Sequence, residues 1–157
     1  MKNVLLIAVF FFMLHTAYGQ DKKTERQQAL EKAIEKQYYV FGAQSATPMS
    51  GMTRNLSAGY EVKVTKDSVI SYLPYFGRAY AAPLPNAEGG IKFTSTKFNY
   101  SMSANKKGTW DISIKFNDVN DTREFTFSIS QDGYGTLQVL SADRQAISFY
   151  GYVEGTK

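Results

Sequence analysis

Apolar and polar side chains alternate along most of the second half of the chain. Phe98–Met102, Trp110–Phe116 and Phe125–Ile129 each place an apolar residue at every second position, with polar residues between them. This period of two is typical of a β-strand with one face on a core and the other in water. Turn-forming residues separate the runs at intervals of roughly 8–12 residues. The pattern predicts a mainly β fold, an antiparallel meander of about 8–9 strands that closes into a small barrel or folds as a sandwich.

One helix precedes the predicted sheet. Leu30, Ile34, Tyr38 and Phe41 follow one another at steps of four, four and three, with charged residues between them. Such an apolar stripe is typical of an amphipathic helix. We expect a helix over residues 24–36 that packs on the sheet. The aromatic residues after it are expected to turn into a strand, because aromatic and β-branched side chains favour strands.

Two further segments complete the predicted meander. Turn-forming residues predict a loop over residues 44–55, and alternation on both sides of Lys66-Asp67 predicts a hairpin over residues 60–73. The predicted interior is lined by large aromatic side chains: Phe93, Phe98, Trp110, Phe116, Phe125, Phe127 and Phe149. A small barrel lined in this way is filled by its own side chains, whereas a wider one holds an apolar ligand.

The N-terminus has the pattern of an export signal. The apolar run Val4–Leu14 follows Lys2, and Ala17-Tyr18-Gly19 supplies the small residues that signal peptidase recognises. The run is too short to cross a bilayer as a stop-transfer helix. We therefore expect residues 1–19 to be a cleaved signal peptide and residues 20–157 to form a single exported domain. The alternative is a retained N-terminal anchor helix.

Composition excludes several kinds of chemistry. The chain has no cysteine, and its one histidine, His15, lies in the predicted signal peptide. The expected domain therefore lacks thiolate nucleophiles, histidine-assisted triads and ordinary zinc sites, and we expect no metal or cofactor and no enzyme activity of these classes. The formal net charge is +4, but basic residues are scattered among carboxylates, so nucleic acid is not an expected partner. After signal cleavage we expect no transmembrane segment.

The segment 71–80 is the strongest candidate for a binding site. It carries Tyr72, Tyr75, Phe76, Arg78 and Tyr80 in ten residues, and a proline and a glycine restrict its bends. Aromatic rings beside a guanidinium form a platform that stacks on sugars or peptides. The structural alternative is a strand-end corner whose aromatic side chains plug one end of the β-core. The sequence is compatible with both interpretations.

Acidic residues offer two weaker candidates. The turn Asn117–Asp121 is rich in oxygen ligands but lacks the glycine and distal glutamate of an EF-hand loop, so a solvated turn explains it better than calcium. Glu61, Asp111 and Glu124 fall on the polar faces of predicted strands. A glycosidase would need two carboxylates at a defined separation across a cleft. Nothing in the sequence pairs these three residues.

Several motifs together resemble a known family. Ser71-Tyr72-Leu73-Pro74-Tyr75-Phe76-Gly77-Arg78-Ala79, Gly90-Ile91-Lys92-Phe93, Gly108-Thr109-Trp110 and the stretch Arg144–Gly151 are similar to the uncharacterised secreted family called domain of unknown function 4251. The likeness extends from the predicted helix to the end of the last motif. It implies an exported protein of a Gram-negative bacterium, in the periplasm or outside the cell. The family brings no known activity, cofactor or catalytic residue.

Three functions are compatible with this sequence. The first is a non-catalytic envelope or periplasmic binding protein for a small or apolar ligand, with the segment around Tyr75 and Arg78 as its site. The second is a protein–protein interaction or inhibitor module that presents a sheet edge or an aromatic corner to its partner. The third is a hydrolase that depends on paired carboxylates.

Overall fold

The computed structural model describes residues 25–80, 89–105 and 108–155, so the predicted signal peptide lies outside the described residues. One helix (residues 25–35) precedes the strands, in agreement with the helix expected over 24–36. The strands are β1 (Tyr39–Pro48), β2 (Arg54–Asn55), β3 (Glu61–Val64), β4 (Val69–Leu73), β5 (Ile91–Ser95), β6 (Phe98–Ala104), β7 (Trp110–Phe116), β8 (Thr122–Ile129), β9 (Tyr134–Ser141) and β10 (Ile147–Gly155).

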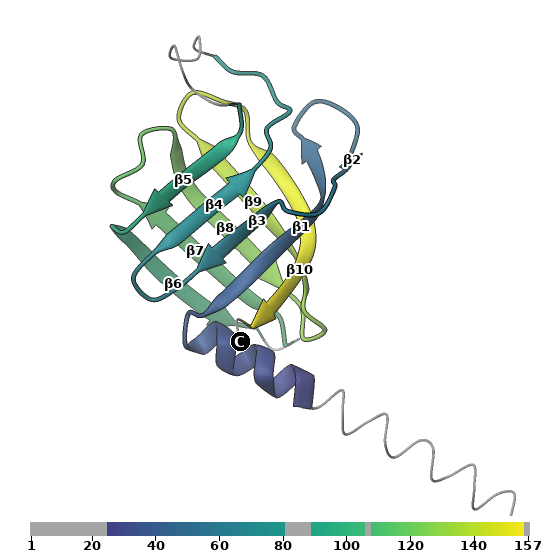
Figure 1. The fold of residues 1–157 in the computed structure, drawn as a ribbon, viewed down its shortest axis with the longest axis vertical. Coiled ribbons are helices and arrows are strands. Elements are labelled where there is room, and N and C mark those ends of the chain that lie inside the picture. Colours follow the sequence, from purple (N-terminus) through teal and green to yellow (C-terminus); the bar gives the residue numbers. More distant parts are fainter. Residues whose placement is uncertain (1–24, 81–88, 106–107, 156–157) are drawn as a thin grey trace, which may run out of the picture.

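The strands form one antiparallel sheet that curls into a nearly closed barrel (Figure 1). Their order is β5-β4-β3-β1-β10-β9-β8-β7-β6, and β2 pairs with β1 beside this path. The predicted meander is confirmed. Its two halves are joined because β1 pairs with β3 on one side and with β10 on the other. This join brings the first and last strands of the chain together.

The prediction of a loop over residues 44–55 was wrong at both of its ends. β1 continues to Pro48, and Arg54 and Asn55 form β2. The register of β1 against β10 shifts between Ala43 and Ser45, which marks a β-bulge, and the strand then continues in pairing with β10. Ser45, Thr47 and Pro48 therefore lie in a strand, because pairing with a distant segment outweighs their local preference, whereas residues 49–53 lie outside the strands as predicted.

The barrel interior is packed with its own side chains. A series of aromatic rings crosses it, with centroid separations of 5.0 Å from Phe93 to Phe116, 4.9 Å from Phe116 to Phe125 and 6.2 Å from Phe125 to Phe127. The Phe127 ring also meets Phe41 at 5.6 Å. These contacts are edge-to-face, the arrangement that the aromatic quadrupole favours. The predicted interior aromatics are confirmed as buried or partly buried against this core.

The helix packs against one end of the barrel (Figure 1). Leu30 and Ile34 are buried in the core, as the apolar stripe predicted, whereas Tyr38 is exposed. The helix ends in a Schellman motif, in which the Tyr38 amide donates to the Ala33 carbonyl at 2.8 Å and the Gln37 amide donates to the Ile34 carbonyl at 3.0 Å. The opposite end of the barrel, called the distal end below, is therefore the end that the helix leaves uncovered.

Asp118 stabilises the turn between β5 and β6 through hydrogen bonds. Its carboxylate accepts hydrogen bonds from the Ser95 hydroxyl at 2.5 Å, the Thr96 amide at 2.9 Å and the Lys97 amide at 3.0 Å. The hydrogen bond from Ser95, followed by that from Thr96, lowers the pKa of Asp118, because each bond favours the ionised form. The acidic turn thus has a structural role in the barrel.

This arrangement predicts a pH-dependent effect of Asp118→Asn. A carboxyl group whose pKa is lower in the folded state stabilises the fold above its unfolded value of about 3.9, and the stabilisation disappears as the pH falls through the folded value. We expect the variant to have a lower free energy of unfolding than the wild type in urea at pH 7. The difference between the two proteins should become smaller below about pH 4. Asp111→Asn, on the outer face of β7, controls for loss of a surface charge. If the difference in unfolding free energy between wild type and Asp118→Asn stays constant between pH 7 and pH 3, the stabilising role of the ionised Asp118 carboxylate is contradicted.

Candidate ligand-binding site

The segment Pro74–Tyr80, called the rim segment here, runs along the distal end of the barrel. Its last residues pair with the loop between β9 and β10, where Ala79 forms a β-bridge with Arg144. The Gln145 amide donates to the Arg78 carbonyl at 3.0 Å, and the Tyr80 amide donates to the Asp143 carbonyl at 2.7 Å. These backbone bonds hold the rim segment against a loop that lies far from it in the sequence.

Tyr75 is the aromatic residue that anchors the rim segment. Its hydroxyl lies 2.9 Å from the Gln145 carbonyl oxygen and 3.0 Å from that of Arg78, and it donates its proton to these acceptors. Burial raises the pKa of the Tyr75 phenol, which keeps it a neutral donor. Gly77 permits this fold of the chain, because a Cβ there would collide with the Tyr75 ring. The guanidinium carbon of Arg144 lies 5.2 Å from the ring centroid, within cation–π range.

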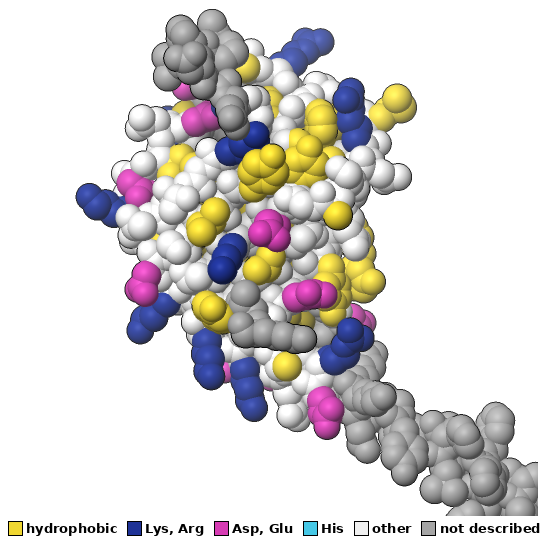
Figure 2. Space-filling view, viewed as in Figure 1, with side chains coloured by type: hydrophobic (Ala, Val, Ile, Leu, Met, Phe, Trp, Pro, Cys, Tyr) yellow, Lys and Arg dark blue, Asp and Glu magenta, His cyan; other side chains and the backbone are white. Residues whose placement is uncertain are grey.

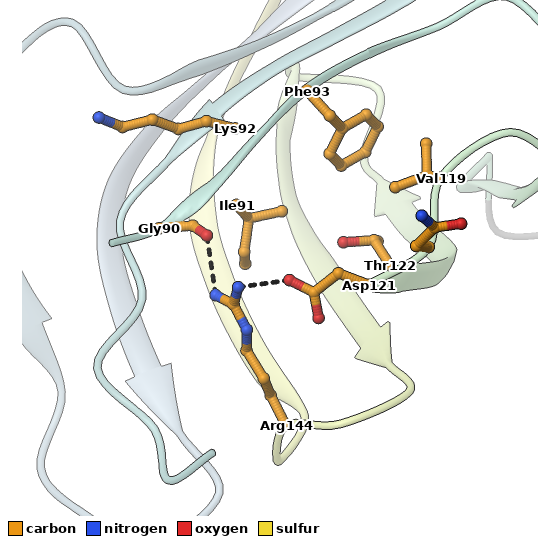
Figure 3. Close-up of a pocket in the computed structure, with 9 residues that line it drawn as sticks. Gly90, Ile91, Lys92, Phe93, Val119, Asp121, Thr122 and Arg144 are labelled. Atoms are coloured by element: carbon orange, nitrogen blue, oxygen red, sulfur yellow. Dashed lines mark hydrogen bonds and ion pairs between the residues drawn. The ribbon is translucent and has the colours of Figure 1, made fainter. Parts of the chain in front are cut away.

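Arg144 connects the rim segment to two other parts of the distal end. Its Nη1 donates to the Gly90 carbonyl at 2.8 Å, and its Nη2 forms an ion pair with Asp121 (Figure 3). The Asp121 carbonyl in turn accepts from the Ala142 amide at 2.9 Å. One guanidinium therefore joins the start of β5, the loop before β8 and the loop before β10. Because the Arg144 side chain is only 20% exposed, these contacts are partly shielded from water.

A cavity of about 430 Å³ opens beside this guanidinium. Its lining residues come from the start of β5, the loop between β7 and β8, and the loop after β9: Gly90, Ile91, Lys92, Phe93, Val119, Asn120, Asp121, Thr122 and Arg144. Figure 3 shows apolar side chains of β5 and Val119 on one side and the Asp121–Arg144 pair on another. The volume lies within the range of small-molecule sites, which is roughly 300–1,000 Å³. We call this space the distal cavity.

The other aromatic residues predicted for the site lie on the outer surface. Tyr72 stacks on Tyr60 with centroids 5.8 Å apart, and the Lys92 Nζ lies 4.8 Å from the Tyr72 centroid. Phe76 lies under the guanidinium of Arg54, at 4.9 Å. Figure 2 shows hydrophobic and basic side chains next to one another on this face of the barrel.

The five predicted residues therefore do not form one platform. Tyr80 is 71% exposed, and Arg78 contributes its backbone carbonyl to Tyr75 while its side chain is exposed. The guanidinium beside Tyr75 belongs to Arg144. Sequence reasoning missed Arg144 and Asp121 as site residues, although Arg144 lies in one of the motifs that carry the family resemblance and Asp121 lies in the acidic turn.

The carboxylates considered for hydrolysis lie apart. Glu61 is on β3, on the opposite half of the barrel from Asp111 on β7 and Glu124 on β8. Glu124 accepts a hydrogen bond from the Ser113 hydroxyl at 2.6 Å on the outer face. The buried polar residues among those described are serines and threonines, and the described ranges contain no cluster of three metal-ligating side chains. No helix in the described part of the chain is long and apolar enough to cross a membrane.

The fold and the distal cavity define a small antiparallel β-barrel with a pocket at one end. Residues 21–153 match the model of a family described as domain of unknown function (DUF4251), and the chain belongs to this family. A DUF4251 family protein from Bacteroides eggerthii DSM 20697, known from its crystal structure, shares the fold with a TM-score of 0.65. The match covers 83% of this chain and 87% of that chain at 16% sequence identity. A search of curated proteins found no match.

Proposed function

We propose that this protein is an exported, non-catalytic binding protein that holds a small ligand in the distal cavity. The observation that carries the proposal is the cavity itself, which combines an apolar wall with an anchored guanidinium. Most small-ligand sites have this composition, with apolar walls and a few polar groups held in place. The Arg144 guanidinium is held in place by Gly90, Asp121 and Tyr75 before any ligand arrives.

The lining also indicates a class of ligand. Ile91, Phe93 and Val119 would contact an apolar body. The cation of the lining is the Arg144 guanidinium, beside the Asp121 carboxylate, whereas the Lys92 ammonium lies over the Tyr72 ring on the outer surface. A guanidinium has five N–H donors, which is more than its two polar partners here require. The ligand of the proposal is therefore a small molecule with an apolar body and an acidic end.

Two sequence features support the other parts of the proposal. The N-terminal apolar run followed by small residues is the pattern of an exported protein. Without His15, which lies in that predicted signal, the chain has neither histidine nor cysteine to serve as a base or a nucleophile. The dispersed positions of Glu61, Asp111 and Glu124 support binding over carboxylate-dependent hydrolysis.

Binding of 8-anilinonaphthalene-1-sulfonate tests this proposal, because the probe has an apolar body and an acidic end and its fluorescence rises in apolar surroundings. We expect Arg144→Met to weaken saturable binding by about tenfold or more, since a hydrogen bond to a charged group contributes about 1.5–3 kcal/mol. Arg123→Met is the matched control, because it removes the same charge from an exposed position on β8, and binding is expected to stay unchanged.

A second variant separates loss of the site from loss of the fold. Val119→Trp enlarges a partly buried side chain of the lining without touching the Arg144 contacts, and it is expected to abolish binding of the probe by filling the cavity. Circular dichroism and urea unfolding serve to check that both variants are folded, which is the expected result. Saturable binding that is the same in wild type, Arg144→Met and Val119→Trp would contradict the assignment of the cavity.

A further inference from the structure

β6 is an edge strand without the usual protection. Among the described strands it pairs with β7 alone, and it is one end of the strand order while β5 is the other. The two strands leave their common corner in different directions (Figure 1). β6 reads Phe-Asn-Tyr-Ser-Met-Ser-Ala over Phe98–Ala104, with no charge and no proline, and its residues from Ser101 onward are exposed. Edge strands normally carry lysine, proline or a bulge that prevents pairing with another chain.

The pairing with β7 determines which backbone groups face the open side. The Asn105 amide donates to the Thr109 carbonyl at 2.9 Å, and the Lys97 carbonyl accepts from the Asn117 amide at 2.8 Å. Because hydrogen-bonding direction alternates along a strand, the odd-numbered residues between these two positions also face β7. The amides and carbonyls of Phe98, Tyr100, Met102 and Ala104 therefore face the open side.

We propose that β6 pairs with β6 of a second copy of this chain, antiparallel and across a two-fold axis at Ser101. In this register Phe98 lies opposite Ala104 of the other copy, and Tyr100 lies opposite Met102. All four residues have their backbone groups on the open side, so every one of these groups gains a partner. Ser101 meets its own counterpart at a position without backbone hydrogen bonds, where opposite Cα atoms approach to about 4.5 Å. A two-fold axis is the commonest symmetry of protein dimers.

The side chains of β6 also suit a second copy. Met102 is 39% exposed and would lie against the Tyr100 ring of the other copy, which is a favourable sulfur–aromatic contact. Lys97 falls opposite Asn105, so no like charges oppose one another along the paired strands. β5 differs, because it has five residues and a lysine, Lys92, in its exposed row.

The interface is expected to be weak. One strand per copy places it at the low end of interface sizes, below about 1,200 Å² in total, where association is transient and depends on concentration. Backbone hydrogen bonds supply most of the attraction in strand addition. The proposal concerns the edge of the sheet and does not depend on a ligand in the distal cavity.

Cysteine cross-linking tests the register directly. The chain contains no cysteine, so Ser101→Cys introduces a single thiol, and the two-fold axis places it against its counterpart at a distance that a disulfide spans. We expect this variant to form a covalent dimer readily under mild oxidation. Ser128→Cys, on the exposed outer face of β8, which is paired on both sides, is the matched control and should remain largely monomeric under the same conditions.

Sedimentation of the protein over a range of concentrations tests the association itself. We expect a reversible monomer–dimer equilibrium, and Ser101→Lys should weaken it by about tenfold because it places like charges directly opposite each other. The effect should be largest at low salt. Ser128→Lys should leave the equilibrium unchanged. A wild-type chain that stays monomeric at high concentration, or equal cross-linking of Ser101→Cys and Ser128→Cys, would overturn the proposal. Capture of a different protein on β6 by a chain that does not self-associate would also overturn it.

Discussion

Phe127→Ala is expected to lower the free energy of unfolding by about 3–5 kcal/mol. The Phe127 side chain is fully buried, and its ring meets the rings of Phe41, Tyr39 and Phe125 at 5.6, 6.3 and 6.2 Å. Its removal takes away the hydrophobic transfer energy and leaves a cavity that the surrounding rings, held in place by strand pairing, fill only in part. Urea unfolding followed by tryptophan fluorescence and circular dichroism measures the change.

Phe76→Ala is the matched control for this prediction. Phe76 is 36% exposed on the rim segment, where its ring contacts the Arg54 guanidinium. Truncation of an exposed side chain of this kind is expected to cost about 1 kcal/mol or less. Similar losses for Phe76→Ala and Phe127→Ala would show that the barrel core is not the main source of stability.

Gly151→Ala is expected to destabilise the protein by about 2–3 kcal/mol, although it adds a single methyl group. A Cβ at this position would collide with the backbone carbonyl oxygen of Gly42 on β1 and would lie 2.9 Å from the Phe41 Cζ. A backbone atom cannot move aside as a flexible side chain can, so the pairing of β1 with β10 must shift. This pairing joins the two halves of the barrel, and we therefore expect the whole transition to occur at lower urea concentration.

Gly42→Ala is a close control for Gly151→Ala, because the two glycines are near neighbours on adjacent strands. A Cβ at Gly42 would meet its nearest neighbour, the Tyr152 carbonyl oxygen, at 3.8 Å, which is an ordinary van der Waals contact. The change is expected to be neutral or to stabilise by about 0.4–1 kcal/mol, because alanine restricts the unfolded chain. Equal destabilisation by the two substitutions would contradict the close approach at Gly151.

The segment around Tyr75 shows which features of a site can be predicted from the local sequence and which cannot. The local sequence predicted that this segment is aromatic, that it bends, and that it lies at the end of a strand. The partner of Tyr75 did not follow, because Arg144 lies far along the chain and reaches the ring only when the β9–β10 loop docks on the rim segment. Arg78, the nearest arginine in sequence, was the natural local choice, but its side chain is exposed.

The same distinction applies to the acidic turn. Its composition indicated a solvated turn, with calcium as the alternative. The structure instead places Asp118 on the amides at the β5–β6 corner and Asp121 on the Arg144 guanidinium. Both partners are brought there by the curvature of the sheet, which the composition of the turn does not encode.

The sequence by itself determined the elements that depend on periodicity: the helix with Leu30 and Ile34 on its buried face, the alternating strands from residue 60 onward, and the aromatic core. Only the tertiary structure decided that the sheet curls into a nearly closed barrel, that residues 44–48 extend β1, and that Arg144 lies at the distal cavity. The physical reason is the separation along the sequence of the residues that interact. Alternation acts between neighbouring residues, whereas closure and the Arg144 contacts depend on strand pairing and docking between distant parts of the chain.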